Sequence, residues 1–97
     1  MVFKVERNSV EFEAELSSGS KCTLTFFELN ARQLKELGEE ASIKENIEVS
    51  FKQLGENLKG DGKEEFINDL LENGSLESFY TAMAEAMKKK REGKRKN

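Results

Sequence analysis

Apolar and polar residues alternate between positions 9 and 28, the pattern of a strand with one face on a core and the other in water. The polar stretch Ser17-Ser18-Gly19-Ser20 interrupts the alternation, and Gly19 can adopt the positive φ of a tight turn. The sequence therefore predicts an antiparallel β-hairpin, and Phe3 and Val5 offer a third, edge strand ahead of it. The apolar positions of the hairpin are Val10, Phe12, Ala14 and Leu16, then Cys22, Leu24 and Phe26.

The first helix after the hairpin has a well-marked start. Asn30 is a favourable N-cap, and Gln33 stands at the reciprocal position of a capping box. Leu29 and Leu34 occupy the two positions of a hydrophobic staple. These signals predict a helix that begins after Asn30 and ends at Gly38.

A second amphipathic helix is expected from Ser42, which forms a capping box with Glu45. Gly55 lies inside this helix and costs about 1 kcal/mol relative to alanine. Its apolar stripe follows at intervals of three and four residues: Ile43, Ile47, Phe51, Leu54 and Leu58.

Two more helices follow a break at Gly60-Asp61-Gly62. Asp61 is expected to cap the third helix, which ends at Asn73-Gly74, and Ser75 is expected to cap the fourth. The residues expected to face inward are Phe66, Ile67, Leu70 and Leu71 in the third helix, and Leu76, Phe79, Tyr80, Met83, Ala84 and Met87 in the fourth.

The order of these elements predicts an α+β fold, because the strands come first and about four short helices follow without alternation. A chain of 97 residues is the size of one small domain. We assign this domain to residues 1–87. The polar residues 88–97 are expected to form a flexible basic tail or a frayed helix end.

The sign of the net charge also changes between residues 87 and 88. Residues 1–87 carry a net charge of −9, and residues 88–97 carry a net charge of +6. The basic segment could bind a polyanion, but it contains no aromatic residue for base stacking, and the acidic body opposes approach to phosphate. Nucleic-acid binding is therefore an alternative rather than the main hypothesis. The candidate residues are Lys88, Lys89, Lys90, Arg91, Lys94, Arg95 and Lys96.

The composition argues against an enzyme. The chain has no His and a single cysteine, Cys22, so it lacks an imidazole base, a Cys–His nucleophile pair and a His–Cys metal cluster. We expect no catalytic residues, no metal and no cofactor. No apolar run approaches the roughly 20 residues that span a bilayer, and the N-terminus lacks a signal-peptide profile. We therefore expect no membrane contact and a cytoplasmic location.

A protein-binding surface is the better hypothesis. Phe27 follows Leu24 and Phe26, which set the inward phase, so its ring should point to the outer face of the sheet. A bulge, burial on both faces or a contact surface would each explain it. Methionines near the end of the last helix suit adaptable binding. The candidate contact residues, all of which are alternatively core, are Phe27, Phe51, Phe79, Tyr80, Met83 and Met87.

The hairpin, the phrase from Leu29 to Leu37 and the short acidic helices resemble the small tail assembly chaperones of long-tailed bacteriophages and prophages. In these proteins a strand runs into a phrase of the type Leu-Thr-x-x-Asp/Gln-Leu-x-x-Leu, and here Asn30 replaces Thr as the cap. The resemblance implies a non-enzymatic protein of the bacterial cytoplasm that binds the tape-measure protein during tail assembly. Many phages with such proteins make a longer second product by a translational frameshift, and an adenine-rich run of codons for Lys88-Lys89-Lys90 could serve as its slippery site.

Two other functions compete with this expectation. One is a small regulatory or nucleic-acid-binding protein that acts through the basic segment. The other is a structural subunit of the tail, which would form a homo-oligomer without a separate partner.

Overall fold

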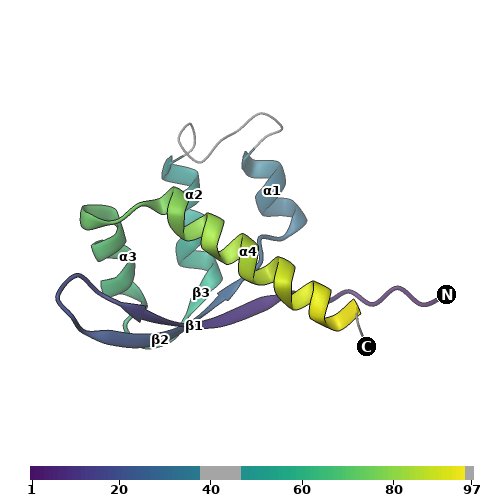
Figure 1. Ribbon diagram of the computed structural model, residues 1–97. Helices are drawn as coiled ribbons and strands as arrows, with labels where there is room; N and C mark the ends of the chain where they lie inside the picture. The colour runs from purple at the N-terminus through teal and green to yellow at the C-terminus, as the bar shows by residue number, and fades with distance from the viewer. Residues whose placement is uncertain (38–46, 96–97) are drawn as a thin grey trace.

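The computed structural model describes residues 1–37 and 47–95. Within these residues a three-stranded antiparallel sheet and four helices form an α+β arrangement, which confirms the predicted fold class (Figure 1). The most N-terminal residues, 1–8, belong to no helix or strand. The elements are β1 (Ser9–Glu15), β2 (Lys21–Phe27), α1 (Ala31–Leu37), α2 (Ile47–Asn57), β3 (Leu58–Lys59), α3 (Lys63–Asn73) and α4 (Leu76–Arg95).

The predicted hairpin is confirmed. β1 and β2 pair in an unbroken register from Ser9 opposite Phe27 to Glu15 opposite Lys21. The turn between them is closed by two backbone hydrogen bonds between Leu16 and the Ser18–Ser20 segment, and Gly19 takes a φ of 95° there. The regular register to the last residue of β2 excludes a bulge as the reason for the outward position of Phe27.

The third strand is not the one that the alternation of Phe3 and Val5 suggested. Leu58–Lys59 forms β3 and pairs antiparallel with Thr25 and Phe26 on the far side of β2. Phe3 and Val5 lie in no strand because residues 33 and 31, which the β1–β2 register would place opposite them, belong to α1. There, the backbone contact between the two segments is the Glu28 N–H to Asn8 carbonyl bond of 2.9 Å.

The capping box of α1 is confirmed by both of its hydrogen bonds. The Gln33 N–H donates to Asn30 Oδ1 at 2.9 Å, and the Asn30 N–H donates to Gln33 Oε1 at 3.0 Å. The Gln33 side chain is buried and also exchanges hydrogen bonds of 2.8 and 3.1 Å with the side chain of Asn57. This cap therefore fixes the start of α1 to the end of α2.

Two expectations for the middle helices are wrong. Asp61 does not cap α3: the N-cap is Gly62, in a left-handed conformation with φ 90° and without a side-chain hydrogen bond. A β-carbon on Gly62 would lie 3.3 Å from Cβ of Cys22, so the close approach of α3 to the sheet favours glycine there. Leu71, expected to face inward, is exposed. The capping box of Ser42 and Glu45 and the start of the apolar stripe at Ile43 lie outside the described residues.

Other boundaries agree with the sequence. α3 ends at Asn73, and the Gly74 N–H donates to the Leu70 carbonyl. Ser75 Oγ accepts the Ser78 N–H at 3.2 Å, which confirms the predicted cap of α4. α4 then continues to Arg95, well past residue 87, where the domain was expected to end. None of the helices within residues 1–37 and 47–95 is long and apolar enough to cross a bilayer.

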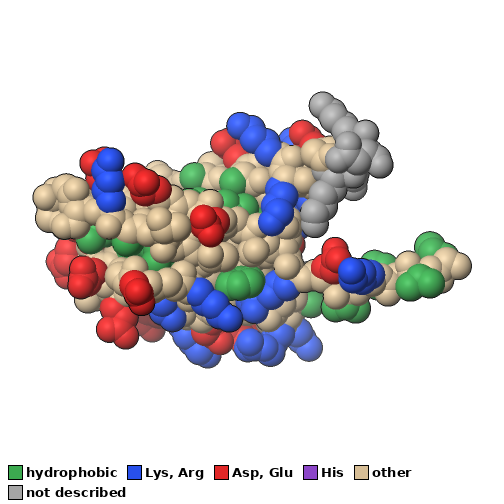
Figure 2. Space-filling model, turned by 90° about the horizontal axis from the view of Figure 1, so that it is seen from below, with side chains coloured by type: hydrophobic (Ala, Val, Ile, Leu, Met, Phe, Trp, Pro, Cys, Tyr) green, Lys and Arg blue, Asp and Glu red, His purple; other side chains and the backbone are tan. Residues whose placement is uncertain are grey.

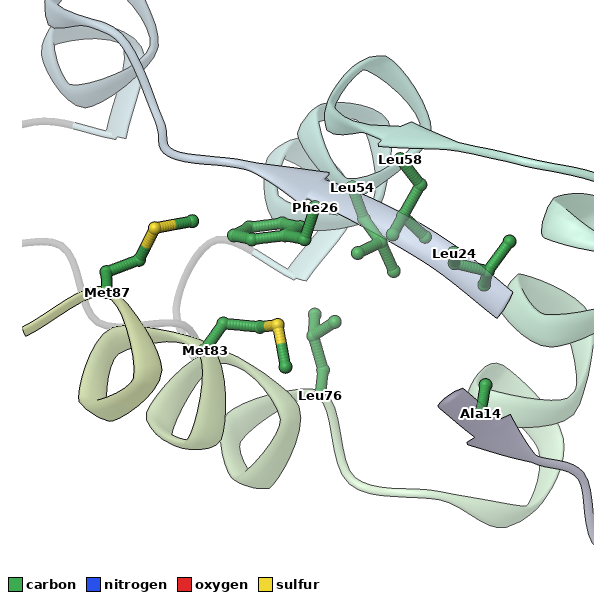
Figure 3. Packing of buried hydrophobic residues seen from close by; sticks show 8 residues of the cluster. All are labelled: Ala14, Leu24, Phe26, Leu54, Leu58, Leu76, Met83 and Met87. Atoms are coloured by element: carbon green, nitrogen blue, oxygen red, sulfur yellow. The ribbon is translucent and has the colours of Figure 1, made fainter. Parts of the chain in front are cut away.

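The inner face of the sheet forms one side of the core, and helices α2 and α4 form the other (Figure 1). Helix α3 packs at the edge of the core. Met83 and Met87 reach from α4 toward Phe26 of β2 (Figure 3). Phe79 makes edge-on or tilted ring contacts with Phe12, Phe26 and Phe66 at centroid distances of 5.4–5.6 Å. The buried apolar residues are Ala14, Leu24, Phe26, Leu54, Leu58, Leu76, Met83 and Met87.

Candidate functional site

An apolar groove of about 420 Å³ opens where the end of β2, the start of α1 and the second half of α4 meet. Its floor consists of buried side chains of the core: Phe26, Met83 and Met87. Its open sides carry Leu34, which is 57% exposed, and the exposed Ala84. The full set of lining residues is Phe26, Glu28, Leu29, Leu34, Tyr80, Met83, Ala84, Met87 and Arg91.

Local sequence explains how the groove forms. On α4 the lining residues fall at intervals of three and four, so Tyr80, Met83 or Ala84, and Met87 lie along one face of the helix. On the other side, Leu29 and Leu34 flank the Asn30 cap. The cap sets the angle at which the chain leaves β2 for α1. The groove is therefore the gap between a capped helix start and the apolar face of a longer helix.

The polar groups at the groove are already partnered. Arg91 pairs with the carboxylate of Glu28 at one end of the groove. Tyr80 donates its hydroxyl proton to the Ser50 carbonyl at 3.0 Å, and burial raises the pKa of Tyr80 to about 12. Tyr80 therefore stays neutral near pH 7. Its hydroxyl already has a hydrogen-bond partner, so its ring lines the groove as an apolar surface. These features favour the binding of an apolar group over chemistry on a substrate.

The structure brings three of the six candidate contact residues together in this groove: Tyr80, Met83 and Met87. Met83 and Met87 are 8% and 3% exposed, so they serve the core and the groove floor at once. Phe79 lies in the aromatic cluster, and Phe51 packs against the core away from the lining residues. Either methionine can still move toward a bound group because its side chain is unbranched and flexible.

Phe27 lies on the other face of the sheet and has a different environment. Its half-buried ring has the Arg7 guanidinium carbon at 5.3 Å and the Lys59 Nζ at 5.2 Å from its centroid. Both distances lie within the range of a cation–π interaction. The two cations explain how an outward phenylalanine is partly covered without a second apolar layer.

Sequence reasoning missed the α1 side of the groove. Leu29 and Leu34 were assigned only to a staple, and Ala84 only to the inward stripe of the last helix. The exposed position of Leu34 depends on the angle between α1 and α4, which no local pattern encodes. The signal that was available is the staple itself, because it places two leucines at the point where the chain leaves the sheet.

The basic residues up to Arg95 belong to α4 and do not form a separate segment. Lys90 donates from Nζ to the Ser9 carbonyl, and Arg91 pairs with Glu28, so these two side chains are directed at the body. Lys88 and Lys89 are exposed on α4. Figure 2 shows lysine and arginine side chains gathered on one part of the surface and acidic side chains on another. The side chains of Lys94 and Arg95, and all of Lys96, lie outside the described part of the structure.

The described residues offer no cluster of three metal-ligating side chains, and Cys22 is a free, half-buried thiol against the core. Asp69 has a structural role. Its carboxylate accepts hydrogen bonds from the Ser17 hydroxyl and N–H and from Asn73, and these bonds lower its pKa. Asp69 thus ties the tip of the hairpin to α3, well away from the groove residues.

No family model, curated protein or solved structure matches the chain.

Proposed function

We propose that this protein is a non-enzymatic assembly chaperone that holds an apolar helical segment of a partner protein in the groove beside α4. The observation that carries the proposal is the groove itself, in which the buried floor of Phe26, Met83 and Met87 opens between the exposed Leu34 and Ala84. Exposed apolar side chains on the sides of a groove favour its occupation by an apolar group.

The dimensions suit a helix. From Tyr80 to Met87 the groove follows α4 for about 10 Å, or two helical turns. An amphipathic helix that lies in such a groove presents anchors at positions i, i+3 or i+4, and i+7. Two methionines in the floor can adapt to different anchor side chains, which suits a partner with many similar but unequal apolar stripes.

The partner that the sequence resemblance suggests is the tape-measure protein of a bacteriophage or prophage tail. A long helical protein of that kind exposes apolar stripes before the tail tube assembles around it, and these stripes would aggregate if left uncovered. Several copies of a weakly binding chaperone along one chain would cover them. The net charge of −9 over residues 1–87 supports a role in keeping such a complex in solution.

Two matched substitutions on α4 test the groove. Ala84 lines it, whereas Ala82 is also exposed and lies on a different surface of the same helix. Ala84→Glu places a charge in the groove, and Ala82→Glu makes the same chemical change outside it. The assay is co-purification with segments of a tape-measure protein, which the proposal expects to be encoded next to this gene.

We expect Ala84→Glu to weaken capture by about tenfold or more and Ala82→Glu to leave it within about twofold. Equal effects of the two substitutions would contradict the groove as the binding site. Gene neighbours without any link to tail assembly would contradict the tape-measure partner.

A further inference from the structure

The chain exposes a short apolar arm that the proposed function does not use. We define the arm as residues 1–7. Phe3 and Val5 in it are 82% and 89% exposed, and Met1 and Val2 are exposed as well. Elsewhere in residues 8–37 and 47–95 the exposed large apolar side chains are less exposed, at 48–57%: Leu34, Ile47 and Leu71. Figure 2 shows the arm projecting from the body with hydrophobic side chains along it.

The root of the arm is fixed to the body. Arg7 donates from Nη2 to Asn57 Oδ1 at 2.7 Å and from Nε to the Glu28 carbonyl at 3.3 Å. The carbonyl of the next residue, Asn8, accepts the Glu28 N–H. The arm therefore leaves the body in a defined direction, and residues 2–7 contain no Gly or Pro that would favour its reversal.

The arm starts beside the groove. The recess next to it, of about 620 Å³, is lined by residues 3–8 together with Glu28, Lys90 and Arg91. Glu28 and Arg91 also line the apolar groove. A twofold axis close to these two residues would therefore bring the arm of one copy to the groove of the other.

The spacing of the arm residues matches the groove. In extended chain Phe3 and Val5 share one face and lie about 6.7 Å apart, which fits within the roughly 10 Å of α4 from Tyr80 to Met87. Lys4 and Glu6 alternate with these anchors, so they lie with Val2 on the opposite face of the extended arm.

We propose that two copies of this chain form a symmetric dimer in which the arm of each copy occupies the apolar groove of the other, with Phe3 and Val5 as its anchors. A phenylalanine alone buries about 150–250 Å². Two arms and the two grooves that they cover remove less than about 1,200 Å² from water, the size of a weak, reversible interface. The exchange is reciprocal, as a twofold interface requires.

The dimer would compete with the partner helix for the same groove. In the absence of a partner the arms would cover both grooves and the apolar arm residues together, which protects the protein from non-specific association. Binding of the partner would release the arm. The dimer itself requires no partner and can be tested without one.

Sedimentation equilibrium of the full chain over a range of micromolar concentrations tests the proposal. We expect a reversible dimer whose dissociation constant rises about tenfold or more in Phe3→Asp and in Val5→Asp. Val2→Asp is the matched control, because Val2 falls on the opposite face of the extended arm, and it should change the constant by less than about twofold. Because these arm residues are exposed, the substitutions leave the core untouched.

The groove side is tested in the same way with Ala84→Glu, which should weaken the dimer, and Ala82→Glu, which should not. A monomer at every concentration would overturn the proposal, whether the arm is free or lies in its own groove. A dimer equally weakened by Val2→Asp and Phe3→Asp, or unaffected by Ala84→Glu, would overturn it as well. The proposed function fails separately, since it depends on capture of a partner helix and not on self-association.

Discussion

The guanidinium of Arg7 lies over the ring of Phe27, with 5.3 Å between its central carbon and the ring centroid. The same side chain donates to Asn57 and to the Glu28 carbonyl. Arg7 therefore connects the start of β1, the end of β2 and the end of α2. Arg7 both covers part of the outward Phe27 ring and anchors the arm to the body.

Removal of the Arg7 side chain should lower the free energy of unfolding more than removal of a typical surface side chain does. Arg7→Ala removes a cation–π contact and a charge-assisted hydrogen bond to Asn57, and we expect the free energy of unfolding to fall by about 1–2 kcal/mol. Lys4→Ala is the control, because Lys4 is exposed and pairs only with Glu6 among the contacts described. Urea unfolding of both variants gives the comparison. An Arg7 variant as stable as the Lys4 variant would show that the contact contributes nothing.

Gln33 should be among the most sensitive polar residues of the fold. Its side chain closes the capping box with Asn30 and meets Asn57 through two hydrogen bonds in a buried setting. Gln33→Ala leaves polar groups of Asn57 without these partners and removes the capping-box bond from the Asn30 N–H to Gln33 Oε1, so we expect a loss of about 2–4 kcal/mol.

A double-mutant cycle with Asn57→Ala separates the two contributions of Gln33. The double mutant should be clearly more stable than the sum of the single losses predicts, because Asn57 then no longer has an unpaired amide. Additive losses would mean that Gln33 stabilises the cap alone.

Gly55→Ala should stabilise the protein. Gly55 lies inside α2, and an added β-carbon would meet no heavy atom of its surroundings within 4 Å. We expect a gain of about 0.5–1 kcal/mol from the lower entropy of the unfolded chain. Gly62→Ala provides the contrast in thermal unfolding, since it places a β-carbon 3.3 Å from Cβ of Cys22 at a φ of 90° and should destabilise. A loss of stability in Gly55→Ala would contradict the described packing of α2.

Tyr80 gives a pH dependence that can be assigned to one residue, because the chain has one tyrosine and no tryptophan. Burial raises its pKa from about 10 in the unfolded chain to about 12. The folded state thus holds the phenolic proton more tightly, so this stabilisation is complete below pH 10 and is lost as the pH rises toward 12. Tyrosinate absorbance of the native protein should titrate near the higher value.

Tyr80→Phe separates this effect from the titration of lysines over the same range. The variant should lose about 1 kcal/mol near pH 7, because the hydrogen bond to the Ser50 carbonyl is gone. Its stability should then fall less than that of the original chain between pH 10 and 12. A native tyrosinate titration near pH 10 would contradict the burial of the hydroxyl.

The sequence predicted the elements that local interactions determine. The hairpin follows from strict alternation around Gly19, and the start of α1 follows from Asn30 and Gln33, whose partners are at most three residues away. The third strand could not be found in this way. Leu58 continues the helical stripe of α2, and only its pairing with Phe26, far away in the chain, makes it a strand residue.

The candidate site was predictable in part for the same reason. Helical spacing placed Tyr80, Met83 and Met87 on one face of α4, and the structure brings this face to the groove. The opposite wall depends on Leu34, which is exposed because of the angle between α1 and α4. Likewise, Asp61 is a residue type that favours the N-cap position, but the approach of Gly62 to Cys22 determines where α3 begins.

The central claim is that an apolar helix binds on the floor of the groove, and methionine methyl NMR tests it most directly. The chain has three methionines, of which Met83 and Met87 form the floor and Met1 lies on the arm. Addition of a helical tape-measure segment should shift the Met83 and Met87 methyl signals in the original chain and in Ala82→Glu, but not in Ala84→Glu. Binding that leaves both signals unchanged would contradict the account.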